Sequence, residues 1–121
     1  AIASSVAHDS HNIIAIGVTD KDIKKAVNLV IKNKGGLALV HDDIEKTLPL
    51  PIAGLMTNKG AFNVAERYIE IEEETRNMGT SLTDPFMTMS FMALLVIPDL
   101  KLSDKGLFDA KNFKFIALDE Q

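Results

Sequence analysis

The sequence contains no cysteine, and this absence limits its chemistry more than any other feature. Without thiols the chain can form no disulfide, offers no thiolate nucleophile and cannot hold a cysteine-ligated zinc ion. The longest apolar run, Phe91 to Ile97, falls far short of the roughly 20 residues of a membrane-spanning helix. The first residues lack the basic segment that opens a signal peptide. We therefore expect a cytoplasmic protein with no membrane partner.

Basic residues are also fewer than acidic ones in this sequence. The chain has 13 basic and 17 acidic residues, which gives a formal net charge of −4. Such a balance provides no electrostatic footprint for nucleic acid or for an anionic membrane surface. With 121 residues, of which 46% are hydrophobic and 25% charged, the chain has the size and composition of one ordinary globular domain. We expect residues 1–121 to form a single domain that binds no nucleic acid.

The clearest predicted element is a helix that starts after Thr19. Thr19 and Asp22 have the spacing of a capping box, in which a hydroxyl and an acid satisfy the first free amides of a helix. Gly35 and Gly36 are suited to end it, since glycine adopts the left-handed cap at low cost. Between these two ends, apolar residues recur with the period of a helix and form one apolar stripe: Ile23, Ala26, Val27, Val30 and Ile31.

A second helix is expected from Ala61 to Met78, and a shorter one starting at Thr83-Asp84-Pro85, where a capping hydroxyl precedes a proline. The inner face of the second helix is assigned to Ala61, Val64, Ala65, Tyr68, Ile69 and Ile71. Its acidic residues Glu70 and Glu72 to Glu74 are interpreted as an exposed face, because adjacent helical positions diverge.

Short apolar runs predict strands at Ile2–Val6, Ile13–Ile16, Leu37–Val40 and Ile44–Leu48, with His41-Asp42-Asp43 as a hairpin turn. The proline-containing segment Pro49–Leu55 is expected to be irregular. Strand character is also expected towards the end of Met89–Ile97 and in short pieces of Leu100–Leu118. These elements predict an α/β (or α+β) fold, a single domain with a mixed β-sheet packed with two main helices.

The densest polar cluster is His8-Asp9-Ser10-His11. Two imidazoles and a carboxylate could ligate a metal or form an acid–base pair with the Ser10 hydroxyl. Their side chains converge only if this segment is a turn, because residues three apart on a strand point to opposite faces. Three readings stay open: a polar turn, a site completed by other domains or subunits, and a self-contained metal site. A self-contained metal site with only these two histidine ligands would be incomplete.

Other catalytic patterns are absent from the sequence. It has no glycine-rich phosphate loop that opens a helix, no Gly-x-Ser-x-Gly elbow and no zinc-binding His-Glu-x-x-His. The methionines and aromatics from Phe86 to Met92 are interpreted as core, with the lining of a purine pocket as the alternative. The residues alone thus indicate an α/β module without a complete catalytic set.

Three stretches of the chain resemble one family, the bacterial and archaeal adenine deaminases. They are Ala1–Ile14, Leu48–Met56 and Asp84–Leu94, the last continuing through Val96-Ile97-Pro98 to Leu100-Lys101-Leu102. Because their order and approximate spacing agree as well, the resemblance covers nearly the whole chain. It identifies the sequence as the C-terminal domain of such an enzyme.

The resemblance implies a parent hydrolase of the amidohydrolase superfamily, active in purine salvage, that converts adenine and water into hypoxanthine and ammonia. In that family divalent metal ions such as manganese or iron activate the attacking water, and their ligands lie in an N-terminal (β/α)8 barrel. Such a barrel needs roughly 200 residues or more, so we expect it to be absent from this chain. No catalytic residue and no metal ligand can be carried over, and the fragment alone is expected to be inactive and to hold no cofactor.

The implied partners are the N-terminal barrel of the same enzyme, adenine, and further copies in a homo-oligomer. On this view His8, Asp9, Ser10 and His11 are candidates for residues near the active-site mouth. The alternatives are a purely structural or oligomerisation module, in which the same residues form a turn, and a small purine-binding domain.

Overall fold

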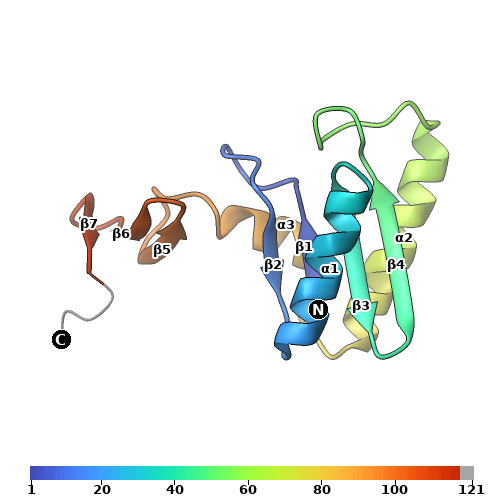
Figure 1. Cartoon of the computed structure of the whole chain (residues 1–121), viewed down its shortest axis with the longest axis horizontal. Coiled ribbons are helices and arrows are strands. Elements are labelled where there is room, and N and C mark those ends of the chain that lie inside the picture. The colour runs from blue at the N-terminus through green and yellow to red at the C-terminus, as the bar shows by residue number, and fades with distance from the viewer. Residues whose placement is uncertain (118–121) are drawn as a thin grey trace.

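The computed structural model describes residues 1–117, which form three helices and two separate sheets (Figure 1). The elements follow in the order β1 (Ile2–Ser4), β2 (Ile14–Ile16), α1 (Asp20–Lys32), β3 (Gly36–His41), β4 (Ile44–Pro49), α2 (Ala61–Asn77), α3 (Pro85–Phe91), β5 (Leu100–Ser103), β6 (Gly106–Asp109) and β7 (Lys114–Ile116). The predicted α/β class is therefore confirmed. No helix among residues 1–117 is long and apolar enough to cross a membrane.

The main sheet has the strand order β2-β1-β3-β4 and lies between two helical layers, with α1 on one face and α2 and α3 on the other (Figure 1). All of its pairs are antiparallel, so the sheet is not mixed as predicted. The reason is that β1 pairs with β2, the next strand along the chain, while β3 and β4 form a tight hairpin. A parallel pair would need a longer crossover between its strands.

Alternation along the central strands sets which helix packs on which face. In β3, Leu37 and Leu39 join the core cluster that contains Ile71 of α2 and Phe86 and Met89 of α3. The intervening residues Ala38 and Val40 pack instead against Ala26 and Val30 of α1. Successive strand residues point to opposite faces, so small side chains face α1 and larger ones face α2 and α3.

The first helix is confirmed in detail. The Thr19 hydroxyl accepts the amide of Asp22 at 3.1 Å and donates to the Asp22 carboxylate at 2.7 Å, as the capping spacing predicted. The helix ends at Lys32, but the left-handed cap predicted for a glycine falls on Lys34, which has a φ of 58°. Gly35 follows with a φ of 114° and donates its amide to the carbonyl of Val30. One position of the apolar stripe is wrong: Ile31 is 57% exposed.

The second helix has the predicted bounds within one residue, but its faces differ from the prediction. Ala61, Ala65 and Ile69 are exposed, whereas Glu72 is buried, with only 7% of its surface accessible. The interpretation of the glutamates as an exposed face is thus wrong at Glu72. Its neighbour Ile71 is fully buried in the core, and the helix turns Glu72 toward the same side. Arg76, one turn later, lies 3.7 Å from the Glu72 carboxylate and offsets part of its charge.

The chain after α3 departs most from the prediction. The apolar residues up to Ile97 form turns instead of a strand, and Thr83 makes no capping hydrogen bond to α3. Strands β5, β6 and β7 then form a second antiparallel sheet that extends away from the main one (Figure 1). Its centre is Phe108, which makes edge-on contacts with Phe113 and Phe115. The expectation at Leu118 lies outside the described residues.

A hydrogen-bonded clasp holds the irregular segment after β4 against the sheet. The Ser5 hydroxyl accepts the amide of Gly36 at 2.8 Å and donates to the carbonyl of Gly54 at 2.5 Å. The backbone approaches closely here: a Cβ on Gly36, where φ is +120°, would lie 2.0 Å from the carbonyl oxygen of Leu48. Only glycine fits this position, since any larger residue would force the strands apart.

We predict that Gly36→Ala destabilises the domain by about 3 kcal/mol or more, because a steric clash adds to the cost of a positive φ. Gly79→Ala is the matched control, since Gly79 also has a positive φ, +106°, but has nothing within 4 Å of its Cβ position. The control should cost about 1 to 2 kcal/mol. Urea denaturation followed by circular dichroism measures both, and equal losses would contradict the steric explanation.

Candidate functional site

The predicted polar cluster forms an exposed turn at one end of the β1–β2 hairpin (Figure 1). His11 donates its amide to the carbonyl of Ala7 at 2.9 Å, which closes the turn. Asp9 and His11 have positive φ values of 66° and 47°, a conformation that costs a residue with a Cβ about 1 kcal/mol or more. The turn that convergence of the two imidazoles requires is therefore present.

His8 is the best-anchored residue of the turn. Its amide donates to the carbonyl of Ser90 at 3.0 Å, and its ring stacks on Phe91 with centroids 5.0 Å apart and planes 21° apart. Its Nδ1 lies 3.4 Å from an Asp9 carboxylate oxygen. Helix α3 thus holds both the backbone and the ring of His8, and the side chain stays 45% exposed. The sequence predicted Phe91 as core or pocket lining and gave Ser90 no role, because the contacts of both with His8 link residues some eighty positions apart and have no local pattern.

The cluster does not form a metal site within this chain. Among residues 1–117 no three histidine, aspartate or glutamate side chains come close enough together to hold a metal ion. The residues present therefore do not fit a divalent cation of their own. What the turn offers is an imidazole beside a carboxylate, a pair that can donate or accept protons for a neighbouring site.

The other histidine, His41, lies at the β3–β4 turn, far along the sheet from His8. Its Nε2 is 3.7 Å from Asp42 and its Nδ1 is 3.8 Å from Glu74 of α2. Lys46 bridges Glu70 and Glu74 at 3.1 and 3.3 Å. The hydrogen bond from Arg67, and after it the contact with Lys46, lowers the pKa of Glu70. These residues link α2 to β4, and none of their contacts involves the turn from His8 to His11, here called the His8 turn.

The methionines and aromatics of α3 divide between core and surface. Phe86 and Met89 are buried as predicted, whereas Met87, Met92 and Phe91 are substantially exposed. Phe86 also lines a cavity of about 250 Å³ between α2, α3 and the sheet, together with Tyr68 and Ser90. This volume lies below the roughly 300 Å³ at which small-molecule pockets usually begin.

Comparison with known proteins identifies the family to which the chain belongs. A sequence model described as "Adenine deaminase C-terminal domain" matches residues 1–114. Relatives named adenine deaminase include those of Methanosarcina acetivorans, 58% identical over 98% of this chain, and Sulfurovum sp., 61% identical over 96%. The relative from Archaeoglobus fulgidus is 50% identical over 98% of the chain. The chain spans only about a fifth of the length of these relatives, 21% or 22%.

Tyr68 provides a direct probe of the cavity, because it is the only tyrosine and the chain has no tryptophan. Burial raises the pKa of the Tyr68 phenol well above its ordinary value, and the neighbouring Glu72 carboxylate raises it further. We predict that phenolate absorbance appears only well above pH ~10, the ordinary tyrosine pKa. The neutral phenol then contributes stability that is complete below about pH 10 and is lost as the pH rises toward the folded-state pKa.

Glu72→Gln should bring this titration to lower pH, since it removes a negative charge beside the phenol. Glu73→Gln, a change at an exposed position of the same helix, is the control and should leave the titration in place. An absorbance titration near pH ~10 in the folded, unsubstituted chain would contradict the burial of Tyr68.

Proposed function

The chain belongs to the adenine deaminase C-terminal domain family, and on this premise we propose that it is the C-terminal domain of an adenine deaminase. The proposed reaction of the longer enzyme is the hydrolysis of adenine to hypoxanthine and ammonia. The observation that carries this proposal is identity of 50% to 61% over nearly the whole chain to proteins named for that activity. We further propose a cytoplasmic enzyme of the amidohydrolase superfamily that serves purine salvage.

The chemistry at the purine ring would come from the larger part of the enzyme. A divalent metal ion supplies a nucleophile near neutral pH by lowering the pKa of bound water. The described residues of this chain bring no three possible ligands together, so the metal would be held by the N-terminal barrel. On this proposal the domain by itself does not deaminate adenine.

The contribution of this domain would be the turn from His8 to His11, placed at the mouth of the barrel site. Three observations support this placement: the turn is exposed, it carries both His8 and His11, and His8 is held by the carbonyl of Ser90 and the ring of Phe91. Left-handed conformations at Asp9 and His11 are the kind of local strain that concentrates at functional positions. In this role Asp9 orients the His8 ring, and His11 and Ser10 contact the substrate side.

A structural role in assembly is the second candidate. It is favoured by the many large apolar side chains that are exposed on this domain, such as Val18, Phe62 and Phe113. Exposed apolar surface often marks a protein interface. In that case the enzyme would be a homo-oligomer held by this domain, and the His8 turn would be only a turn. Light scattering of the enzyme with and without the domain distinguishes the two.

We predict that His8→Ala or His11→Ala in the full-length enzyme lowers kcat/KM for adenine by about tenfold to a hundredfold, the scale of a lost proton-transfer or positioning group. The thermal midpoint should stay unchanged in His11→Ala, because His11 is exposed, and should fall only slightly in His8→Ala, which loses the contact with Phe91. His41→Ala is the matched control, since it removes an imidazole on the far side of the sheet, and its kcat/KM should equal that of the unsubstituted enzyme. Unchanged kinetics in all three variants would leave the turn without a role at the active site.

We also predict that ammonia release depends on the metal of the longer enzyme and not on this domain. Chelation should abolish deamination by the full-length enzyme, and added manganese or iron should restore it. The 121-residue chain, assayed with the same metals, should release no ammonia from adenine. Deamination at an enzymatic rate by this chain alone would overturn the assignment of the chemistry to the barrel.

A further inference from the structure

The outer edge of β2 is the least protected part of the main sheet. Among the described strands, β2 pairs only with β1, so its other side has no strand partner. The segment from Asn12 to Val18 contains no charged residue and no proline. Natural proteins usually protect such an edge with lysine, proline or a covering element, because free amides and carbonyls recruit other chains.

The opposite edge of the same sheet shows that protection. Strand β4 carries Glu45, Lys46 and a terminal Pro49, and helix α2 packs beside it. From that helix, Arg67 donates its Nε–H to the carbonyl of Thr47 at 2.9 Å. The β4 edge therefore carries charged residues and a side chain bonded to its backbone, whereas β2, although it contacts α1 and α3, carries no charged residue.

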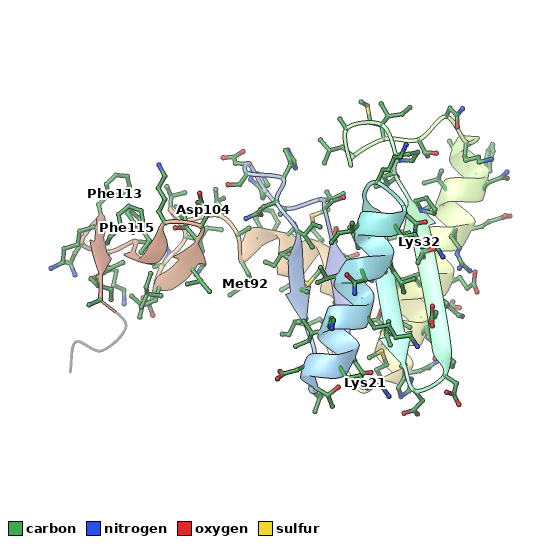
Figure 2. All side chains as sticks on the ribbon, in the orientation of Figure 1. Lys21, Lys32, Met92, Asp104, Phe113 and Phe115 are labelled. Atoms are coloured by element: carbon green, nitrogen blue, oxygen red, sulfur yellow. The ribbon has the colours of Figure 1, made fainter. Side chains whose placement is uncertain are left out.

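Two apolar hollows flank the unprotected edge. One, of about 560 Å³, lies between Ala1, the end of β2 and the start of α3, and the other, of about 410 Å³, lies between β2 and β5. Met92 lines both hollows, and Figure 2 shows it beside β2 on the side from which the second sheet extends. The exposed apolar side chains along this line, here called the open-edge face, are Ile13, Ile16, Val18, Met92, Leu100 and Leu102.

We propose that the open-edge face is where this domain docks onto the remainder of its own longer polypeptide, a proposal that rests on the proposed function. The relatives are about five times as long as the matched segment, which covers 21% of their length, so a large body is available to cover the face. Ala1 itself lines the larger hollow. A body linked to this domain through the same polypeptide would be held beside it.

Covalent attachment favours the domain's own chain over a second copy. A tethered partner is present at a high effective concentration, whereas a second copy must be recruited from solution. The occupant is expected to present a mainly apolar surface, because six large apolar side chains are exposed along this face and Lys101, which also lines the hollow between β2 and β5, is buried. Asn12, next to His11, lines the hollow between β2 and β5, so a body docked here also reaches the His8 turn.

Cysteine labelling tests the proposal, since the chain has no cysteine of its own. Val18→Cys and Met92→Cys report the open-edge face in the full-length enzyme. Phe62→Cys and Ile69→Cys on α2 are the matched controls: Phe62 is 87% exposed against 100% for Val18, and Ile69 and Met92 are both 52% exposed. The rate of maleimide labelling at each introduced residue is read by peptide mass spectrometry.

We expect the two open-edge cysteines to label at least about tenfold more slowly than their controls, because access limits thiol reaction. The shielding should persist on dilution. Labelling of Val18→Cys as fast as Phe62→Cys overturns the proposal. Shielding that disappears on dilution indicates a second copy instead, and slow labelling at all four positions would remove the distinction between the faces. Both of these outcomes also overturn it.

The adenine assay on the same preparations keeps the two proposals separate. An enzyme that deaminates adenine but labels rapidly at Val18→Cys retains the proposed function and loses the docking face. An enzyme that is inactive on adenine but shielded at both open-edge positions retains the docking face and loses the proposed substrate.

Discussion

The structure depends on one constraint, that both faces of β1 and β3 must be covered by helices. Alternation in β3 sends Leu39 to the layer of α2 and α3 and Ala38 to α1, and β1 repeats the pattern with Ile2 and Ala3. Once these central strands are buried on both sides, the sheet can meet its surroundings only at its two edges and at the loops between strands. The two features for which we propose a role lie there: the His8 turn at one end, and the open edge of β2 along the side.

Local signals in the sequence were sufficient for the elements whose structure is local. The cap at Thr19 and the hairpin turn at Asp42 depend on residues only a few positions apart, and both appear as predicted. Burial of Glu72 could not be predicted in the same way, because it depends on how α2 lies against α3. The apolar run up to Ile97 has the composition of a strand, but within the described chain no neighbouring strand pairs with it. A residue composition can favour a strand, but the strand forms only when a neighbouring strand pairs with it.

In the candidate site too, the sequence predicted the local feature but not the contact between distant residues. The sequence indicated a polar turn with two histidines, and the structure confirms the turn. It could not indicate that Phe91 stacks on His8, because β1 and α3 come together only when the sheet is complete. This contact gives the turn its functional interest, since an imidazole held by packing presents its nitrogens in a fixed direction. On the proposed function, this domain anchors the turn, and the substrate and metal are bound by the rest of the enzyme.

The proposed function also offers a reason for the unequal edges of the sheet. A domain that acted alone would gain from charged residues or a helix along β2, as it has along β4 with Lys46 and Arg67. A domain whose turn must reach a site built on another part of the enzyme needs an apolar face that fixes its position relative to that part. Because β2 leads directly out of the His8 turn, contact along β2 would set the direction in which His8 and His11 point. Docking and orientation of the turn are then consequences of the same strand.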